Sequence, residues 1–151
     1  MSINQDFSDL FAELNAAGAR YLLVGGYAIA VHAEPRFTKD LDLWIDREGD
    51  NPSRVYEALD RFGAPMQQFA LEDLRRPEMV IQLGVAPNRI DLVTSIDGVI
   101  FKDAWPSRTE TMYGDHIVPV IGLDQLIENK RASGRPQDLA DVDLLTKHRD
   151  N

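Results

Sequence analysis

The chain has 151 residues, of which 44% are hydrophobic and 27% charged, a balance typical of a folded globular protein. Its length predicts a single domain over residues 1–151. Twenty-five acidic and sixteen basic residues give a formal charge of −9, which disfavours extended binding to nucleic acid or to an anionic membrane. The lack of cysteine excludes disulfides, thiolate metal ligands and a cysteine nucleophile. The polar N-terminus lacks a signal-peptide pattern and no apolar run is long enough to span a bilayer, so we expect a cytoplasmic protein.

Local patterns predict helices and strands that follow one another along the chain. Apolar residues three and four apart mark helices, strict alternation marks strands, and glycine and proline mark the turns. In chain order we expect a helix over residues 2–17, a strand over 21–24, a helix over 27–32, a strand over 39–46, a helix from Asn51, a short helix over 71–76, strands over 79–83 and 89–94, β-structure over 108–120, and helices over 123–132 and 136–148. The fold class that follows is α/β (α+β), a short mixed β-sheet with helices packed on one side and the functional site on its open face.

A Gly-Gly pair joins the strand over residues 21–24 to the helix that follows it. Glycines at such a junction let backbone N–H groups approach an anion, and the helix N-terminus adds positive potential. Gly25 and Gly26 suit an ordinary tight turn equally well. Neither a Gly-x-Gly-x-x-Gly fingerprint nor a P-loop is present, so the pair by itself assigns no ligand.

Three aspartates occupy polar positions of predicted strands. Asp40 and Asp42 share one strand face because they are two residues apart, and Asp91 lies on a later strand. If the two strands are neighbours, the three carboxylates form a cluster whose mutual repulsion requires protons or cations. Oxygen ligands of this kind suit Mg²⁺ or Mn²⁺. The alternative is a set of solvated aspartates on the polar face of an edge strand.

The combination of these features resembles the signature of the DNA polymerase beta-like nucleotidyltransferase superfamily. Its parts here are Leu23-Val24-Gly25-Gly26, then Asp40-Leu41-Asp42-Leu43, then Ile90-Asp91-Leu92. The stretch Arg36-Phe37-Thr38-Lys39-Asp40 is most similar to the minimal and abortive-infection-toxin-like (AbiEii-type) branches. The resemblance covers residues 20–95 and extends more loosely to residues 130–141, which are similar to a C-terminal Lys…Arg…Asp-x-x-Asp motif.

The resemblance implies a nucleotidyltransferase-like fold and a role for each matching residue. Gly25 and Gly26 would hold the triphosphate of a nucleotide. Asp40 and Asp42 would be catalytic ligands of Mg²⁺ or Mn²⁺, and Asp91 would complete the second metal site and help to deprotonate the acceptor hydroxyl. The family often has serine where this chain has Gly26, so a hydroxyl contact to phosphate is lost.

Several cations and one hydroxyl are candidates for the same site. Lys130 lies on the core-facing stripe of its helix and needs an anionic partner or an exit to solvent. A catalytic role, in contact with a phosphate or a catalytic carboxylate, and a lysine that reaches solvent near the helix C-terminus are equally compatible with this position. Arg36 and Lys39 are candidates for nucleotide binding, with solvated loop charges as the alternative. Thr38, a third nucleotide-binding candidate, would orient Asp40 or cap its strand.

Further residues border these motifs. Asp138 and Asp141 share a helix face and are expected to form a solvated acidic surface, with Arg135 placed to pair with Asp138. Trp44 shares the strand face of the aspartates and is expected to border the site.

The resulting hypothesis is transfer of a nucleoside monophosphate from an NTP onto a hydroxyl acceptor, with release of pyrophosphate. A transfer RNA end, a protein side chain and a small molecule all remain open as acceptors. A second hypothesis is that the protein is the toxin of a toxin–antitoxin pair, restrained by an antitoxin. A separate hypothesis, based on the short length, is that a partner or a homodimer completes the acceptor pocket. The alternative is a catalytically inactive binding or interaction module on the same fold.

Overall fold

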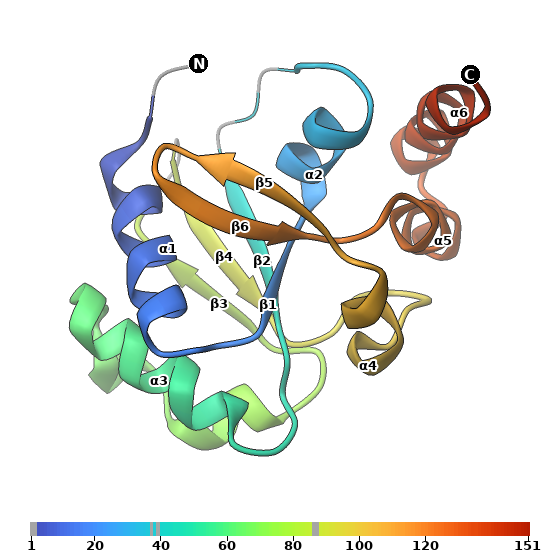
Figure 1. The fold of residues 1–151 in the computed structure, drawn as a ribbon. Helices are drawn as coiled ribbons and strands as arrows, with labels where there is room; N and C mark the ends of the chain where they lie inside the picture. The colour runs from blue at the N-terminus through green and yellow to red at the C-terminus, as the bar shows by residue number, and fades with distance from the viewer. Residues whose placement is uncertain (1–2, 37, 39, 86–87) are drawn as a thin grey trace.

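A six-stranded mixed sheet forms the centre of the molecule (Figure 1). The computed structural model describes residues 3–36, 38, 40–85 and 88–151. The helices are α1 (Gln5–Ala16), α2 (Gly25–His32), α3 (Asn51–Phe62), α4 (Phe101–Ala104), α5 (Leu123–Ser133) and α6 (Pro136–Asp150). The strands are β1 (Tyr21–Val24), β2 (Leu41–Ile45), β3 (Val80–Leu83), β4 (Ile90–Val93), β5 (Thr109–Tyr113) and β6 (His116–Val120). The predicted α/β class with a mixed sheet is confirmed, but helices lie on both sides of the sheet and not on one side as expected.

The strands lie in the order β3-β4-β2-β1-β6-β5. β2 runs antiparallel to β1 and parallel to β4, and β1 runs parallel to β6. Each edge strand pairs antiparallel with its inner neighbour. The parallel pair β2–β4 needs a long connection, which α3 and the chain up to β3 supply. This crossover brings two segments about fifty residues apart in sequence side by side at the centre of the sheet.

One face of the sheet packs against helices and forms the main core. Leu41, Leu43 and Ile45 of β2 alternate along the strand and are at most 1% exposed. α1 and α3 contact each other and lie together on one side of the sheet, whereas α5 and α6 form a pair on the other side (Figure 1). Alternation along β2 therefore directs Asp42 away from the α1–α3 layer.

Most predicted elements are present, with shifted boundaries. α2 begins at Gly25, so the Gly-Gly pair forms its first turn instead of a separate loop. The short helix expected over residues 71–76 is a 3-10 helix over Leu71–Arg75. The sequence patterns missed α4 and the 3-10 helices Met66–Gln68 and Trp105–Ser107.

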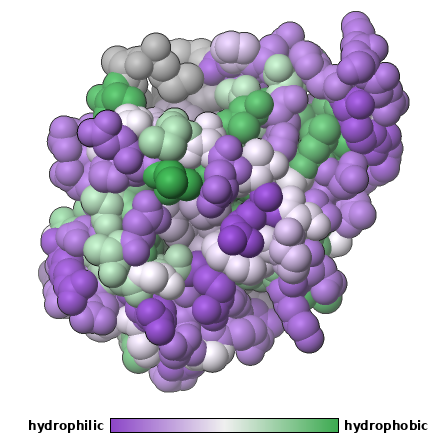
Figure 2. Space-filling view, in the orientation of Figure 1, coloured by the Kyte–Doolittle hydropathy of each residue, from purple (hydrophilic) through white to green (hydrophobic). Residues whose placement is uncertain are grey.

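The described surface offers no membrane-spanning element. None of its helices combines the length and the apolar character that a bilayer crossing requires. On the side seen in Figure 2, apolar residues lie in small groups among a hydrophilic majority.

Candidate active site

Two aspartates meet at the centre of the sheet because of the register between β2 and β4. Asp42 lies directly opposite Asp91 in this parallel pair, so both side chains point to the same face. Asp40 precedes β2 by one residue and lies two positions from Asp42 on the same side. On β1, Val24 is the register partner of Asp42 and leads directly into Gly25. The register thus brings the predicted carboxylates and the Gly-Gly pair to one place.

Arg89 contacts two of the three carboxylates. Its Nε donates to Asp91 Oδ1 at 2.9 Å and its Nη2 to Asp91 Oδ2 at 3.1 Å, which makes a two-pronged ion pair. The same Nη2 lies 3.7 Å from Asp40 Oδ2, and the Arg89 backbone N–H donates to Asp40 Oδ1 at 2.9 Å. The sequence patterns assigned Arg89 no role, although its position two residues before Asp91 on a strand places both side chains on one face.

Asp42 is a carboxylate whose ionisation is costly in this cluster. Burial, followed by the negative charges of Asp91 and Asp40, raises the pKa of Asp42 from 3.8 to about 6. The positive charges of Lys130 and Arg89 act in the opposite direction but do not cancel the increase. The site therefore favours a further positive charge or a proton beside Asp42.

The Gly-Gly pair lets the start of α2 approach the carboxylates closely. Gly25 has φ +70°, and a Cβ at this position would collide with Asp42 Oδ2. A Cβ at Gly26 would lie 2.8 Å from Thr38 Cγ2 and 3.2 Å from Thr38 Oγ1. Thr38 therefore places a hydroxyl close to where a serine side chain at position 26 would stand. Because Gly25 and Gly26 have no Cβ, their backbone lies directly against Asp42 and Thr38.

Lys130 lies in a charge network between α5 and α6 and is only 13% exposed. Its Nζ is 3.4 Å from Asp138 Oδ1 and 3.7 Å from Asp141 Oδ2. The Lys130 ammonium thus contacts the carboxylates of Asp138 and Asp141 and does not extend into solvent. Its positive charge also lowers the pKa of Asp42, against the larger effect of burial.

The same network corrects one prediction and accounts for another cation. Asp138 is fully buried and not part of a solvated face, because Arg135 holds it at 2.7 Å and Lys130 adds a second positive charge. The Arg135 hydrogen bond lowers the pKa of Asp138. Arg36, a candidate for nucleotide binding, pairs with Asp141 of α6 at 3.0 Å. Lys39 lies outside the described residues.

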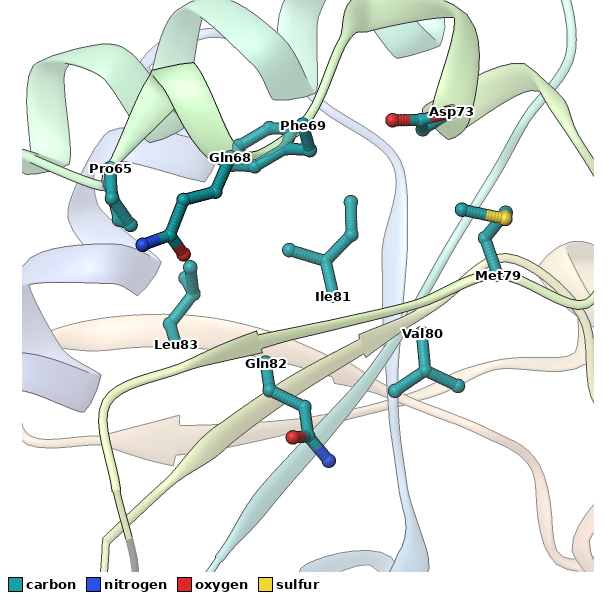
Figure 3. A pocket seen from close by; sticks show the side chains of 9 residues that line it. All are labelled: Pro65, Gln68, Phe69, Asp73, Met79, Val80, Ile81, Gln82 and Leu83. Atoms are coloured by element: carbon teal, nitrogen blue, oxygen red, sulfur yellow. The ribbon is translucent and has the colours of Figure 1, made fainter.

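One more polar residue reaches the carboxylate face. Gln82 of β3 is the register partner of Asp91, and its exposed side chain lies on the same face. Figure 3 shows Gln82 and Val80 pointing to one side of β3, whereas Ile81 and Leu83 point to the other side. Gln82 thus continues the row formed by Asp42 and Asp91 toward the edge of the sheet. Only the β3–β4 register reveals this neighbour.

Two cavities lie near the sheet, and neither is lined by Asp40, Asp42 or Asp91. A hollow of about 170 Å³ is enclosed by Ile81, Leu83 and the segment around Phe69 on the opposite side of β3 (Figure 3). A larger one of about 450 Å³ lies at the carboxyl ends of β2 and β4 and includes Trp44 and Phe101 in its lining. Trp44 is 1% exposed, packs edge-on against Phe101 at 5.0 Å, and has no hydrogen-bond partner for its Nε1 among the described residues. The tryptophan is therefore a core residue beside the site, with no open face toward it.

The chemistry of the cluster fits a divalent cation. It offers carboxylate oxygens on one face, a raised pKa at Asp42, and a pair of glycines beside them. The positively charged Arg89 guanidinium already bridges Asp40 and Asp91, as a bound metal ion would. Within the described part of the chain, however, no three acidic or imidazole side chains are arranged to hold a metal ion, and both Asp91 oxygens face Arg89.

No protein-family model and no curated protein matches the sequence. Solved structures, in contrast, match over nearly the whole chain. The lincosamide antibiotic adenylyltransferase LnuA, in its lincomycin-bound structure, superposes with a TM-score of 0.57 at 16% identity, covering 98% of this chain and 99% of its own. TM1012 from Thermotoga maritima, a protein assigned as a nucleotidyltransferase, superposes with a TM-score of 0.58 at 14% identity, covering 99% and 96%. The chain therefore has the fold found in these nucleotidyltransferases.

Proposed function

We propose that this protein is a metal-dependent nucleotidyltransferase that moves a nucleoside monophosphate from an NTP onto a hydroxyl group. The observation that carries the proposal is the register of Asp42 opposite Asp91, with Gly25 packed against the Asp42 carboxylate. The similarity of fold to LnuA and TM1012 supports it. The acceptor oxygen would form a bond to the α-phosphorus, the bond to the pyrophosphate would break, and the acceptor proton would leave to a base.

The start of α2 is the expected cradle for the triphosphate. The first N–H groups of a helix have no partner within the helix and carry positive potential. Here they belong to glycines, so no Cβ blocks a phosphate from approaching them. Thr38 adds a hydroxyl at the same turn.

Asp40, Asp42 and Asp91 would hold Mg²⁺ or Mn²⁺ between them and the phosphates. Such an ion neutralises the phosphate charge and stabilises the leaving oxygen when it is bound. Asp91 would then accept the acceptor proton, and Lys130 adds a positive charge that acts on Asp42. Asp138 and Asp141 hold the Lys130 ammonium in position.

A binding test separates this proposal from an inactive module on the same fold. We expect each NTP with Mg²⁺ or Mn²⁺ to raise the melting temperature of the wild type by several degrees, since a ligand at 100 times its Kd adds about 2.7 kcal/mol. Asp42→Asn should lose that gain, whereas Asp60→Asn, an exposed aspartate of α3, should retain it. The absence of any metal-dependent gain in the wild type would contradict the proposal and favour a binding module.

The transfer reaction is tested with α-labelled NTP and three classes of hydroxyl acceptor: RNA ends, proteins and small molecules. LnuA is named for action on lincosamide antibiotics, so a panel of small hydroxylated molecules is the first choice here. We expect label transfer to fall at least about 100-fold in Asp42→Asn, because a site that stabilises transition-state charge loses one of its fixed groups. Label on a bacterial RNA or protein, together with growth arrest on expression that a second chain relieves, would support the toxin role.

A further inference from the structure

Arg89 and a metal ion would compete for the same carboxylate oxygens. The guanidinium uses two nitrogens on the two oxygens of Asp91, at 2.9 and 3.1 Å, and reaches Asp40 at 3.7 Å. It therefore contacts two of the three aspartates that the proposed function assigns to metal binding. A cation shared by Asp40, Asp42 and Asp91 needs at least one oxygen of Asp91. Each of these oxygens already accepts a hydrogen bond from the guanidinium, whose positive charge would lie beside the cation and repel it.

The geometry of the Arg89–Asp91 ion pair allows the Arg89 side chain to move away from Asp91. Asp91 is fixed in the centre of the sheet and its side chain is 13% exposed, whereas the Arg89 side chain is 32% exposed at the rim. Release of the guanidinium would move a side chain that already reaches solvent further into water. The Arg89 backbone remains in place because its N–H is bonded to Asp40 Oδ1 and β4 begins at the next residue. The side chain can thus swing out while the strand keeps its register.

The positive charge of Arg89 offsets the repulsion between the three carboxylates when no metal is bound. Three carboxylates on one face repel one another, and a bound divalent ion would carry twice the charge of a guanidinium. Arginine keeps its charge at all physiological pH values, so it stabilises the cluster whenever the metal is absent.

We infer that Arg89 is an internal cation that occupies the place of a divalent metal at Asp91 and must release this carboxylate before the metal site is complete. This inference rests on the proposed function, because it takes the three aspartates as metal ligands. Arg89 is accordingly a residue that sets metal affinity, and not a catalytic residue.

The test is the affinity for Mn²⁺ alone, measured by electron paramagnetic resonance and by calorimetry on the full chain without nucleotide. Arg89→Gln removes the charge and keeps much of the side-chain length. Arg61→Gln removes the same charge from an exposed pair with Glu57 on α3 and controls for net charge. We expect Arg89→Gln to bind Mn²⁺ about tenfold more tightly than the wild type, because a fork of charge-assisted hydrogen bonds no longer competes, and Arg61→Gln to change affinity less than about twofold.

Equal or weaker Mn²⁺ binding by Arg89→Gln, with a folded circular-dichroism spectrum, would overturn the inference while leaving the metal site intact. If none of the three proteins binds Mn²⁺ alone, the same comparison is made with NTP present, because the phosphates would supply further oxygen ligands. Absence of Mn²⁺ binding there too would overturn the metal site itself and with it the proposed function. Arg89→Lys is the second variant if Arg89→Gln does not fold. It keeps the charge but cannot form the fork, so its affinity should lie above that of the wild type, and an unchanged affinity would again overturn the inference.

Discussion

Replacing Asp42 by asparagine should stabilise the metal-free protein, and only above about pH 4. The pKa of this carboxyl is about 6 in the folded state, against an ordinary value of 3.8 for an unperturbed aspartate. A difference of about 2 pKa units corresponds to about 3 kcal/mol of unfolding free energy. Because the folded state holds this proton more tightly than the unfolded state, the Asp42 contribution to stability falls as the pH rises from about 4 to about 6 and is constant above.

Asparagine is neutral at every pH and resembles the protonated aspartic acid in shape. The unfolding free energy of Asp42→Asn should therefore equal that of the wild type at about pH 4 and exceed it by at most about 3 kcal/mol at about pH 8. The assay is urea denaturation followed by circular dichroism across this pH range in the presence of a chelator. Asp60→Asn, on the exposed face of α3, is the control and should differ little from the wild type at any pH. A gain that is independent of pH, or a loss of stability at the alkaline end, would refute the electrostatic reasoning.

Two further variants test buried polar groups away from the carboxylates. Asn51 is fully buried; its side chain accepts from the Arg20 N–H at 2.6 Å and donates to the carbonyls of Arg20 and Asp46 at 3.0 and 2.6 Å. Asn51→Asp replaces the donor by a charged acceptor, so it should lower the unfolding free energy at neutral pH by at least about 3 kcal/mol, measured by thermal or urea unfolding. A loss below about 1 kcal/mol would contradict this assignment. Thr146 Oγ1 is buried with no hydrogen-bond partner among the described residues, so Thr146→Val, of nearly the same shape, should raise the unfolding free energy by about 1 kcal/mol; a decrease would mean that the hydroxyl has a partner.

The order of helices and strands followed from local patterns because those patterns report which face of each element is apolar. The alternation of Leu41, Asp42 and Leu43 predicted both β2 and the face that carries the aspartate, and each was confirmed. The helix start at Gly25 was missed. The 3-10 helices Met66–Gln68 and Trp105–Ser107 were also missed, since a single turn leaves no period to detect. α4 was missed for the same reason, at four residues.

The partners of the candidate site depended on long-range register, which no local pattern contains. The motif residues indicated three aspartates and a lysine, but the pairing of Asp42 with Asp91 required β2 and β4 to be neighbours in parallel. Likewise, the ion pair between Arg36 and Asp141 depends on the packing of α6, which no local pattern contains. Burial is a property of the assembled fold in the same way, so Asp138, expected to be solvated, is fully buried.

The sequence alone determined the chemistry available to this protein: acidic oxygen ligands, a glycine junction at a helix start and no cysteine. These are properties of residue types and of spacings within one strand or turn, which survive any arrangement of the elements. Only the tertiary structure decided how the charges are balanced, because Coulomb interactions depend on distances between segments far apart in the chain. It is that balance, with Arg89 on Asp91 and the charge of Lys130 acting on Asp42, that sets the electrostatics of the site.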